Sequence, residues 1–160
     1  MSHAAWMLQA ESDLDAAKLL SVNNQHPQAI WFAGQAVEKA HKAVLVALGL
    51  RYQESHFKKF SHTTSEVANL LPSALHQPTD PQIGAKLEVL EKLAMSSRYP
   101  APAQGSQWIA PVSSMNSSAQ EVADAELLLD WCRERVLRAL KAVGAMQPAV
   151  PLAQPVPTIP

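Results

Sequence analysis

The 160-residue sequence is poor in cysteine and glycine and contains no long apolar run. Its one cysteine, Cys132, excludes an internal disulfide framework and agrees with a reducing compartment. The five glycines stand singly, which excludes a glycine-rich phosphate loop. No segment approaches the ~18 apolar residues that a transmembrane helix needs, and the N-terminus lacks the pattern of a signal peptide. We therefore expect a cytoplasmic protein that does not contact a membrane.

The sequence also lacks a strong charge of either sign, since its formal net charge is −1. Nothing global then attracts the protein to nucleic acid, and any such contact must be local. The most basic stretch is the link Arg51–Ser61, which contains Lys58 and Lys59. The histidines do not have the paired spacing of zinc ligands, so we expect no metal site, and we expect no cofactor.

What the sequence does contain is helical periodicity, which predicts five helices and no strand. The first two are expected over His3–Val22 and Pro27–Leu48. A short third helix follows the capping box Thr63–Glu66. The fourth opens at Asp80-Pro81, and the last runs from the capping box Ser118–Glu121 to Gly144. Basic residues crowd the C-terminal half of the last helix, where the helix dipole favours cations: Arg133, Arg135, Arg138 and Lys141.

These amphipathic helices predict a helix bundle in one domain, residues 1–146. Residues 147–160 hold five prolines and no charge, which predicts a disordered tail or an extended ligand for a partner. The connection Arg98–Ser117 is about twenty residues long, and ordered loops of that length are often functional.

Three motifs carry a resemblance to a known family. Trp6 and the pattern Asp13-Leu14-x-x-Ala17 lie on the first predicted helix. Residues 29–45 of the second helix contain Trp31, Gly34 and the run QAVEKAHKA. Arg98-Tyr99-Pro100 follows the fourth helix. In this order, over about residues 4–142, the motifs resemble the HEPN family (higher eukaryotes and prokaryotes nucleotide-binding), in a subgroup with the RYP element.

The resemblance implies an all-α, up-and-down bundle of four main helices plus a short extra helix, usually assembled as a homodimer. Family members include metal-independent ribonucleases of toxin–antitoxin systems, non-catalytic partners of minimal nucleotidyltransferases, and the nucleotide-binding C-terminal domain of sacsin. Fold alone does not choose among these functions.

The ribonuclease members carry an arginine followed four to six residues later by a histidine. A guanidinium can stabilise phosphate charge, and an imidazole can act in acid–base chemistry near neutral pH. Arg51 and His56 have this spacing, but they follow the second helix, whereas the family motif lies towards the final helices. This position favours a solvated pair over a catalytic one.

Arg98 and Tyr99 form the more informative candidate. The proline at position 100 biases Tyr99 towards an extended backbone, in which an arginine–aromatic pair can contact phosphate and stack on a base. The structural alternative is that Tyr99 packs on the bundle while Arg98 caps the C-terminus of the fourth helix.

Lys39, Lys42 and His62 complete the set of candidate nucleotide-binding residues. The two lysines lie three apart on one helical face, where they either line a nucleotide or RNA groove or pair with Gln35 and Glu38 on a solvated face. His62 directly precedes a capping box and either orients a phosphate at the helix amides or packs locally.

The function that the sequence favours is therefore a non-catalytic HEPN protein. It is expected to bind a nucleotide or RNA, or to pair with a nucleotidyltransferase in a toxin–antitoxin-like system. Two alternatives stay open: a metal-independent endoribonuclease that uses Arg51 and His56, and a protein-interaction scaffold that works through its tail.

Overall fold

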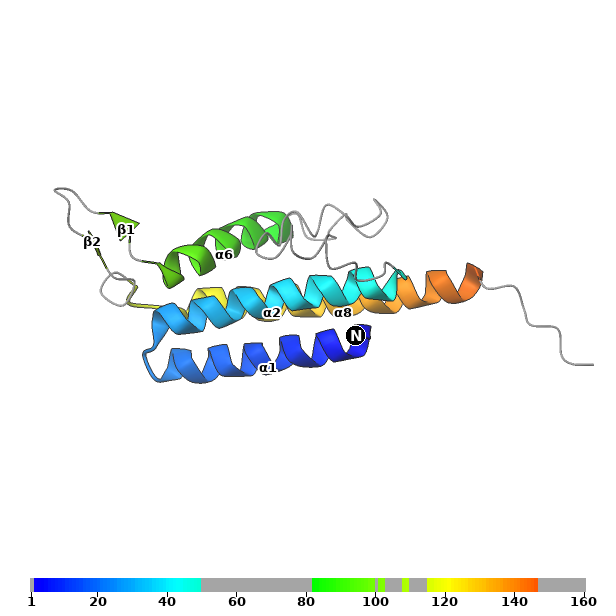
Figure 1. Cartoon of the computed structure of the whole chain (residues 1–160), viewed down its shortest axis with the longest axis horizontal. Coiled ribbons are helices and arrows are strands. Elements are labelled where there is room, and N and C mark those ends of the chain that lie inside the picture. Colours follow the sequence, from blue (N-terminus) through cyan, green and yellow to red (C-terminus); the bar gives the residue numbers. More distant parts are fainter. Residues whose placement is uncertain (1, 50–81, 100, 103–107, 110–114, 147–160) are drawn as a thin grey trace, which may run out of the picture.

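The computed structural model describes residues 2–49, 82–99, 101–102, 108–109 and 115–146. Within these ranges the chain forms four helices and one short strand pair. The helices are α1 (His3–Val22), α2 (His26–Ala47), α6 (Gln82–Arg98) and α8 (Ala119–Met146). Successive helices run in opposite directions, and α2 and α8 lie between α1 and α6 (Figure 1). The predicted all-α, up-and-down bundle is confirmed.

Helix α2 is the centre of the bundle because small side chains cover much of its surface. It packs against each of the other three described helices. Alanine ends at Cβ, so neighbouring backbones can approach closely, and it is also the best helix former. The fully buried alanines of α2 are Ala29, Ala33, Ala36, Ala40 and Ala43.

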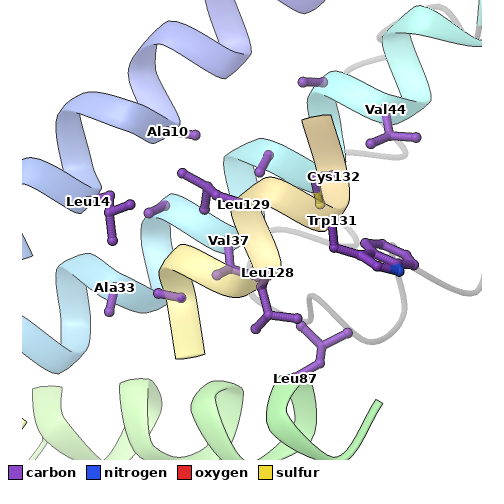
Figure 2. Close-up of a cluster of buried hydrophobic side chains, with 14 of the residues drawn as sticks. Ala10, Leu14, Ala33, Val37, Val44, Leu87, Leu128, Leu129, Trp131 and Cys132 are labelled. Carbon is purple, nitrogen blue, oxygen red and sulfur yellow. The ribbon is translucent and has the colours of Figure 1, made fainter. Parts of the chain in front are cut away.

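The larger core side chains come from all four helices. Val37 of α2 lies next to Leu128 and Leu129 of α8, while Leu14 of α1 and Leu87 of α6 approach from opposite sides (Figure 2). Burying one such leucine stabilises the fold by about 1.5–3 kcal/mol. The apolar spacing that predicted the helices therefore also identified the faces that meet.

Gly34 marks a close approach of α2 to α6. A Cβ atom at this position would lie 2.5 Å from the Cβ of Ala94, well inside the roughly 3.5–4.0 Å at which carbon atoms attract. The Ala94 methyl is attached directly to the α6 backbone and cannot rotate away. Glycine at position 34 therefore sets the distance between these two helices.

Hydrogen bonds join three helix ends at one end of the bundle. Ser118, directly before α8, is buried, and its hydroxyl donates to Ser21 Oγ of α1 at 2.8 Å. His26 Nδ1, at the start of α2, lies 3.0 Å from Ser118 Oγ. In the reversal between α1 and α2, Asn24 has a φ of +58°, a left-handed conformation that asparagine tolerates. The predicted end of α1 at Val22 and the predicted start of α8 at the capping box Ser118–Glu121 are confirmed.

Three helix ends differ from the prediction, and one of them is the end of α2, at Ala47 instead of Leu48. Helix α8 continues past Gly144 to Met146, because a glycine inside a helix costs only about 1 kcal/mol relative to alanine. Helix α2 begins at His26 and keeps Pro27 in its first turn, where the missing amide hydrogen is not needed.

A strand pair in the connection after α6 was also not predicted. Ala101–Pro102 (β1) pairs antiparallel with Trp108–Ile109 (β2). Two residues are too few to produce an alternating pattern in the sequence. The predicted short helix after Thr63 and the tail 147–160 lie outside the described residues. Of the described helices, none is both long and apolar enough to cross a bilayer.

We expect the substitution Gly34→Ala to destabilise the protein by about 1–3 kcal/mol, the usual cost of overpacking a core contact. The new methyl must push α6 away from α2. Denaturant unfolding measures the change, and the double variant Gly34→Ala with Ala94→Gly is expected to recover most of it.

Gly84→Ala is the matched control, because a Cβ at Gly84 meets no atom within 4 Å. Helix propensity alone then predicts a gain of up to about 1 kcal/mol. If Gly34→Ala were as stable as Gly84→Ala, the close approach would not constrain the bundle.

Candidate functional site

An arginine stacked on an aromatic ring marks the surface where α6 ends beside α2. The Cζ atom of Arg98 lies 4.7 Å from the ring centroid of Trp31 and 5.3 Å from that of Tyr99. Arg98 and Tyr99 are both exposed, and Trp31 is half-buried. In the part of the chain that the structure describes, the Arg98 side chain contacts these two rings and forms no ion pair or hydrogen bond. Its N–H groups therefore remain available to an anion.

The sequence positions this cluster through helical spacing on two helices. Glu91, Met95 and Arg98 recur at intervals of four and three on α6, so they share one face. Trp31 and Gln35 share a face of α2 for the same reason. The close approach at Gly34 brings the two faces together. Arg98 and Trp31 are far apart in sequence, so only the tertiary packing joins them.

A pocket opens between these two faces. It is shallow: its enclosed volume is about 10 Å³, which is room for a single water molecule. Its polar lining consists of Gln35, Glu38 and Glu91, and its apolar lining of Trp31, Gly34, Ala94 and Met95. The two charged groups of the lining are both carboxylates, whereas the arginine beside it is a cation. An anionic group of a ligand is complementary to the Arg98 guanidinium at the edge of this surface.

Gln35 and Glu38 are held in place by hydrogen bonds. Gln35 Nε2 donates to Glu38 Oε2 at 3.2 Å. The other carboxylate oxygen, Glu38 Oε1, pairs with the Lys42 ammonium. Glu38 and Lys42 are both buried, and the Lys42 ammonium also lies 5.3 Å from the Trp6 ring centroid.

Lys39, the other lysine of the predicted strip, pairs with Asp13 of α1. Asp13 is buried, and its carboxylate accepts hydrogen bonds from Lys39 and from Gln9 Nε2, the latter at 3.1 Å. The pairing of Lys42 with Glu38 was one of the predicted alternatives, but its placement on a solvated face was wrong. Both lysines are neutralised within the bundle, which favours a structural role.

The remaining sequence candidates, Arg51, His56 and His62, lie outside the described residues. Their catalytic or binding roles stay predictions. In the described part of the chain, no group of three or more histidine, cysteine, aspartate or glutamate side chains is arranged to hold a metal ion.

A second buried cluster was missed by sequence reasoning. The Arg135 guanidinium lies 4.1 Å from the Trp131 ring centroid, and Arg135 has no exposed surface. The helix-dipole explanation does not hold for Arg135, because α8 continues eleven residues beyond it to Met146. Burial lowers the pKa of Arg135. Helical periodicity predicts aliphatic residues at buried positions. No neighbouring residue in the sequence indicates that Arg135 is buried.

Cys132 belongs to the core beside this cluster. Its Sγ lies 3.6 Å from His41 Nδ1, which in turn lies 2.9 Å from the Val37 carbonyl oxygen. Burial raises the pKa of the Cys132 thiol far above its usual range. The thiol therefore stays protonated and is no nucleophile.

Comparison with known proteins identifies relatives of the whole helical unit. The HEPN domain family matches residues 3–136. The curated relative "Putative toxin MJ1304" of Methanocaldococcus jannaschii is 29% identical over 137 residues, which cover 78% of this chain and 82% of the relative.

Two solved structures share the fold. TT1696 from Thermus thermophilus superimposes with a TM-score of 0.61 at 21% identity, covering 87% of this chain and 96% of that one. ST0689, an archaeal HEPN homologue, gives a TM-score of 0.51 at 24% identity, covering 91% of this chain and 97% of that one. At these identities the two structures show the shared fold alone.

The buried pair of Asp13 and Lys39 leads to a stability prediction. We expect Asp13→Ala to destabilise the protein by about 1–3 kcal/mol, because it removes the acceptor of a charged hydrogen bond. Lys39 is partly exposed and can turn to water, which keeps the loss below that of a fully buried pair. Asp15→Ala, at an exposed position of the same helix, is expected to change stability by less than about 0.5 kcal/mol. Equal unfolding midpoints for the two variants would contradict the structural role of the pair.

Proposed function

The chain belongs to the HEPN domain family, and from that premise we propose that it binds a nucleotide or RNA as one member of a toxin–antitoxin-like pair. The binding surface in this proposal is the end of α6 with Arg98 and Tyr99, together with Trp31 of α2. We propose no catalytic role for these residues.

The observation that carries the proposal is the exposed guanidinium of Arg98. The guanidinium lies over the Trp31 ring, 4.7 Å from its centroid, and its exposed N–H groups can donate to a phosphate. Arginine binds phosphate with two parallel hydrogen bonds, which lysine cannot do. Tyr99 is 52% exposed and offers an aromatic face of the kind on which single-stranded bases stack.

The toxin–antitoxin part of the proposal is supported by the curated relative whose name contains the word toxin. Within such a pair, we propose a nucleotidyltransferase as the partner and a homodimer as the assembled form of this chain. Large apolar side chains lie exposed on the outer faces of α1 and α8, which favours protein contacts. They include Leu8, Leu19, Val22, Leu127 and Leu137.

The ribonuclease alternative uses Arg51 and His56. The same relative favours it, because cleavage of RNA is one way in which a toxin can act. An RNA-degradation assay in EDTA separates the two functions. Cleavage that His56→Ala abolishes would establish the nuclease, and intact RNA supports the binding function.

We expect Arg98→Ala to weaken nucleotide binding by about 1–3 kcal/mol in isothermal calorimetry, the scale of a lost charged hydrogen bond. Arg98→Lys keeps the charge but loses the planar fork, so we expect it to recover only part of the affinity. The fold should survive both changes, because an exposed cation–π contact contributes only about 0.5–1 kcal/mol.

Lys92→Ala is the matched control, because it removes one positive charge from an exposed position of the same helix. It is expected to bind as the wild type does. If Arg98→Ala and Lys92→Ala lost equal affinity, a general charge effect would replace the specific role of Arg98.

A further inference from the structure

Two exposed ion pairs join α1 to α8 on the surface that these helices share, called here the α1–α8 face. Glu11 of α1 pairs with Arg133 of α8 at 3.0 Å, and Lys18 of α1 pairs with Glu126 of α8 at 2.6 Å. Arg133 also pairs with Asp130 of its own helix. The four side chains of the two interhelical pairs are 40–51% exposed. Carboxylates, ammonium groups and guanidinium groups each form several hydrogen bonds, so these side chains can take further partners.

The two ion pairs have opposite order on the face. In the first pair the acid, Glu11, belongs to α1 and the base to α8. In the second pair the base, Lys18, belongs to α1 and the acid to α8. The two positions on each helix are seven residues apart, which keeps them on one side of that helix, two turns from each other. Each helix therefore presents one acid and one base, in opposite directions because α1 and α8 are antiparallel (Figure 1).

This order makes the face complementary to itself. Consider a second copy that is turned by 180° about an axis lying in the interface and crossing both helices between the two pairs. On α1 this rotation brings Glu11 opposite Lys18 of the second copy. On α8 it brings Glu126 opposite Arg133 of the second copy. Every charge of the two pairs then meets an opposite charge, which is the condition for an isologous contact.

Apolar side chains extend the same match beyond the ion pairs. Leu8 and Leu137 lie one turn beyond the Glu11–Arg133 pair and are 68% and 60% exposed. Leu19 and Val22 lie at the other end of α1 and are 66% and 81% exposed. The same rotation places Leu8 within one turn of Leu19 and Val22 of the second copy. Burial of these side chains supplies the apolar part of an interface whose ion pairs supply its register.

The size of the face is sufficient for a specific contact. Helix α1 has 20 residues, which correspond to a length of about 30 Å, and two neighbouring helices are together about 20 Å wide. A face of these dimensions offers roughly 600 Å² per copy, at the lower end of the areas that specific protein interfaces bury.

From the opposite order of the two ion pairs we infer that the α1–α8 face binds a second copy of this chain, with α1 antiparallel to α1 and α8 antiparallel to α8. The inference rests on the homodimer of the proposed function and deepens it, because it names the face and the register. Arg98 lies at the end of α6, which does not belong to this face. The candidate nucleotide-binding surface therefore stays open in both copies.

The double variant Lys18→Glu with Glu126→Lys tests the register. It keeps the ion pair between α1 and α8 and the net charge, so the single chain should fold as the wild type does. Across the proposed interface, however, Glu11 now meets a glutamate and Arg133 meets a lysine. Like charges in contact oppose association, so we expect the dissociation constant of the dimer to rise at least about tenfold. Sedimentation equilibrium of the full chain measures it.

The matched control is Lys86→Asp with Asp124→Lys, which exchanges the charges of an ion pair between α6 and α8, outside the α1–α8 face. It is expected to dimerise as the wild type does. A four-residue variant adds Glu11→Arg and Arg133→Glu to the first exchange. This variant restores the opposite order of the two pairs, so it is expected to recover most of the association.

A second variant keeps the test decisive if the exchanged chain does not fold. Leu19→Asp places a charge among the apolar side chains of the interface and is expected to weaken the dimer. Val89→Asp is its control, since Val89 is 54% exposed on α6. Circular dichroism verifies the helical fold of every variant.

The outcomes separate this inference from the proposed function. A wild-type chain that stays monomeric up to ~100 μM overturns both the face and the homodimer, whereas nucleotide binding is tested independently by Arg98→Ala. A dimer that neither the first exchange nor Leu19→Asp weakens overturns the α1–α8 face but leaves the homodimer standing. A dimer that the first exchange weakens and the four-residue variant restores supports the inference.

Discussion

The close packing of small residues along α2 is the constraint on which the rest of the structure depends. Its buried alanines let α1 and α8 approach its backbone, and Gly34 does the same for α6. Because Ala94 leaves no room for a Cβ at position 34, the separation of α2 and α6 has little freedom. The distance between Trp31 and Arg98 follows from that separation. A single small residue in the core thus determines the geometry of an exposed cluster.

The polar residues in the middle of α2 have two different roles. Lys39 and Lys42 form ion pairs, whereas Gln35 and Glu38 line the pocket. Lys39 and Lys42 point their charges at Asp13 and Glu38, inside or at the edge of the bundle. A buried pair of this kind adds little net stability, but the loss of one partner is costly. Its value here is orientation, since Lys42 holds the Glu38 carboxylate at the wall of the pocket. Lys42 therefore supports the candidate site without belonging to it, whereas Lys39 joins α2 to α1.

Arg98 and Tyr99 could be selected from sequence because an arginine–aromatic–proline run at the end of a helix is unusual. Trp31 could not be assigned to the same site, since its position in an apolar helix is equally typical of a core residue. The buried Arg135 could not be predicted at all. Sequence periodicity treats arginine as a surface residue, and only the packing of Trp131 against its guanidinium reveals where it lies.

The sequence by itself determined the number, type and approximate limits of the described helices, because apolar periodicity and capping residues act over a few neighbouring positions. It also determined the family, through motifs that lie within single helices or at their ends. The tertiary structure alone decided which charges are paired, which aromatic ring carries Arg98, and where the pocket opens. Those features depend on side chains that are distant in sequence, and their positions follow from the approach of whole helices.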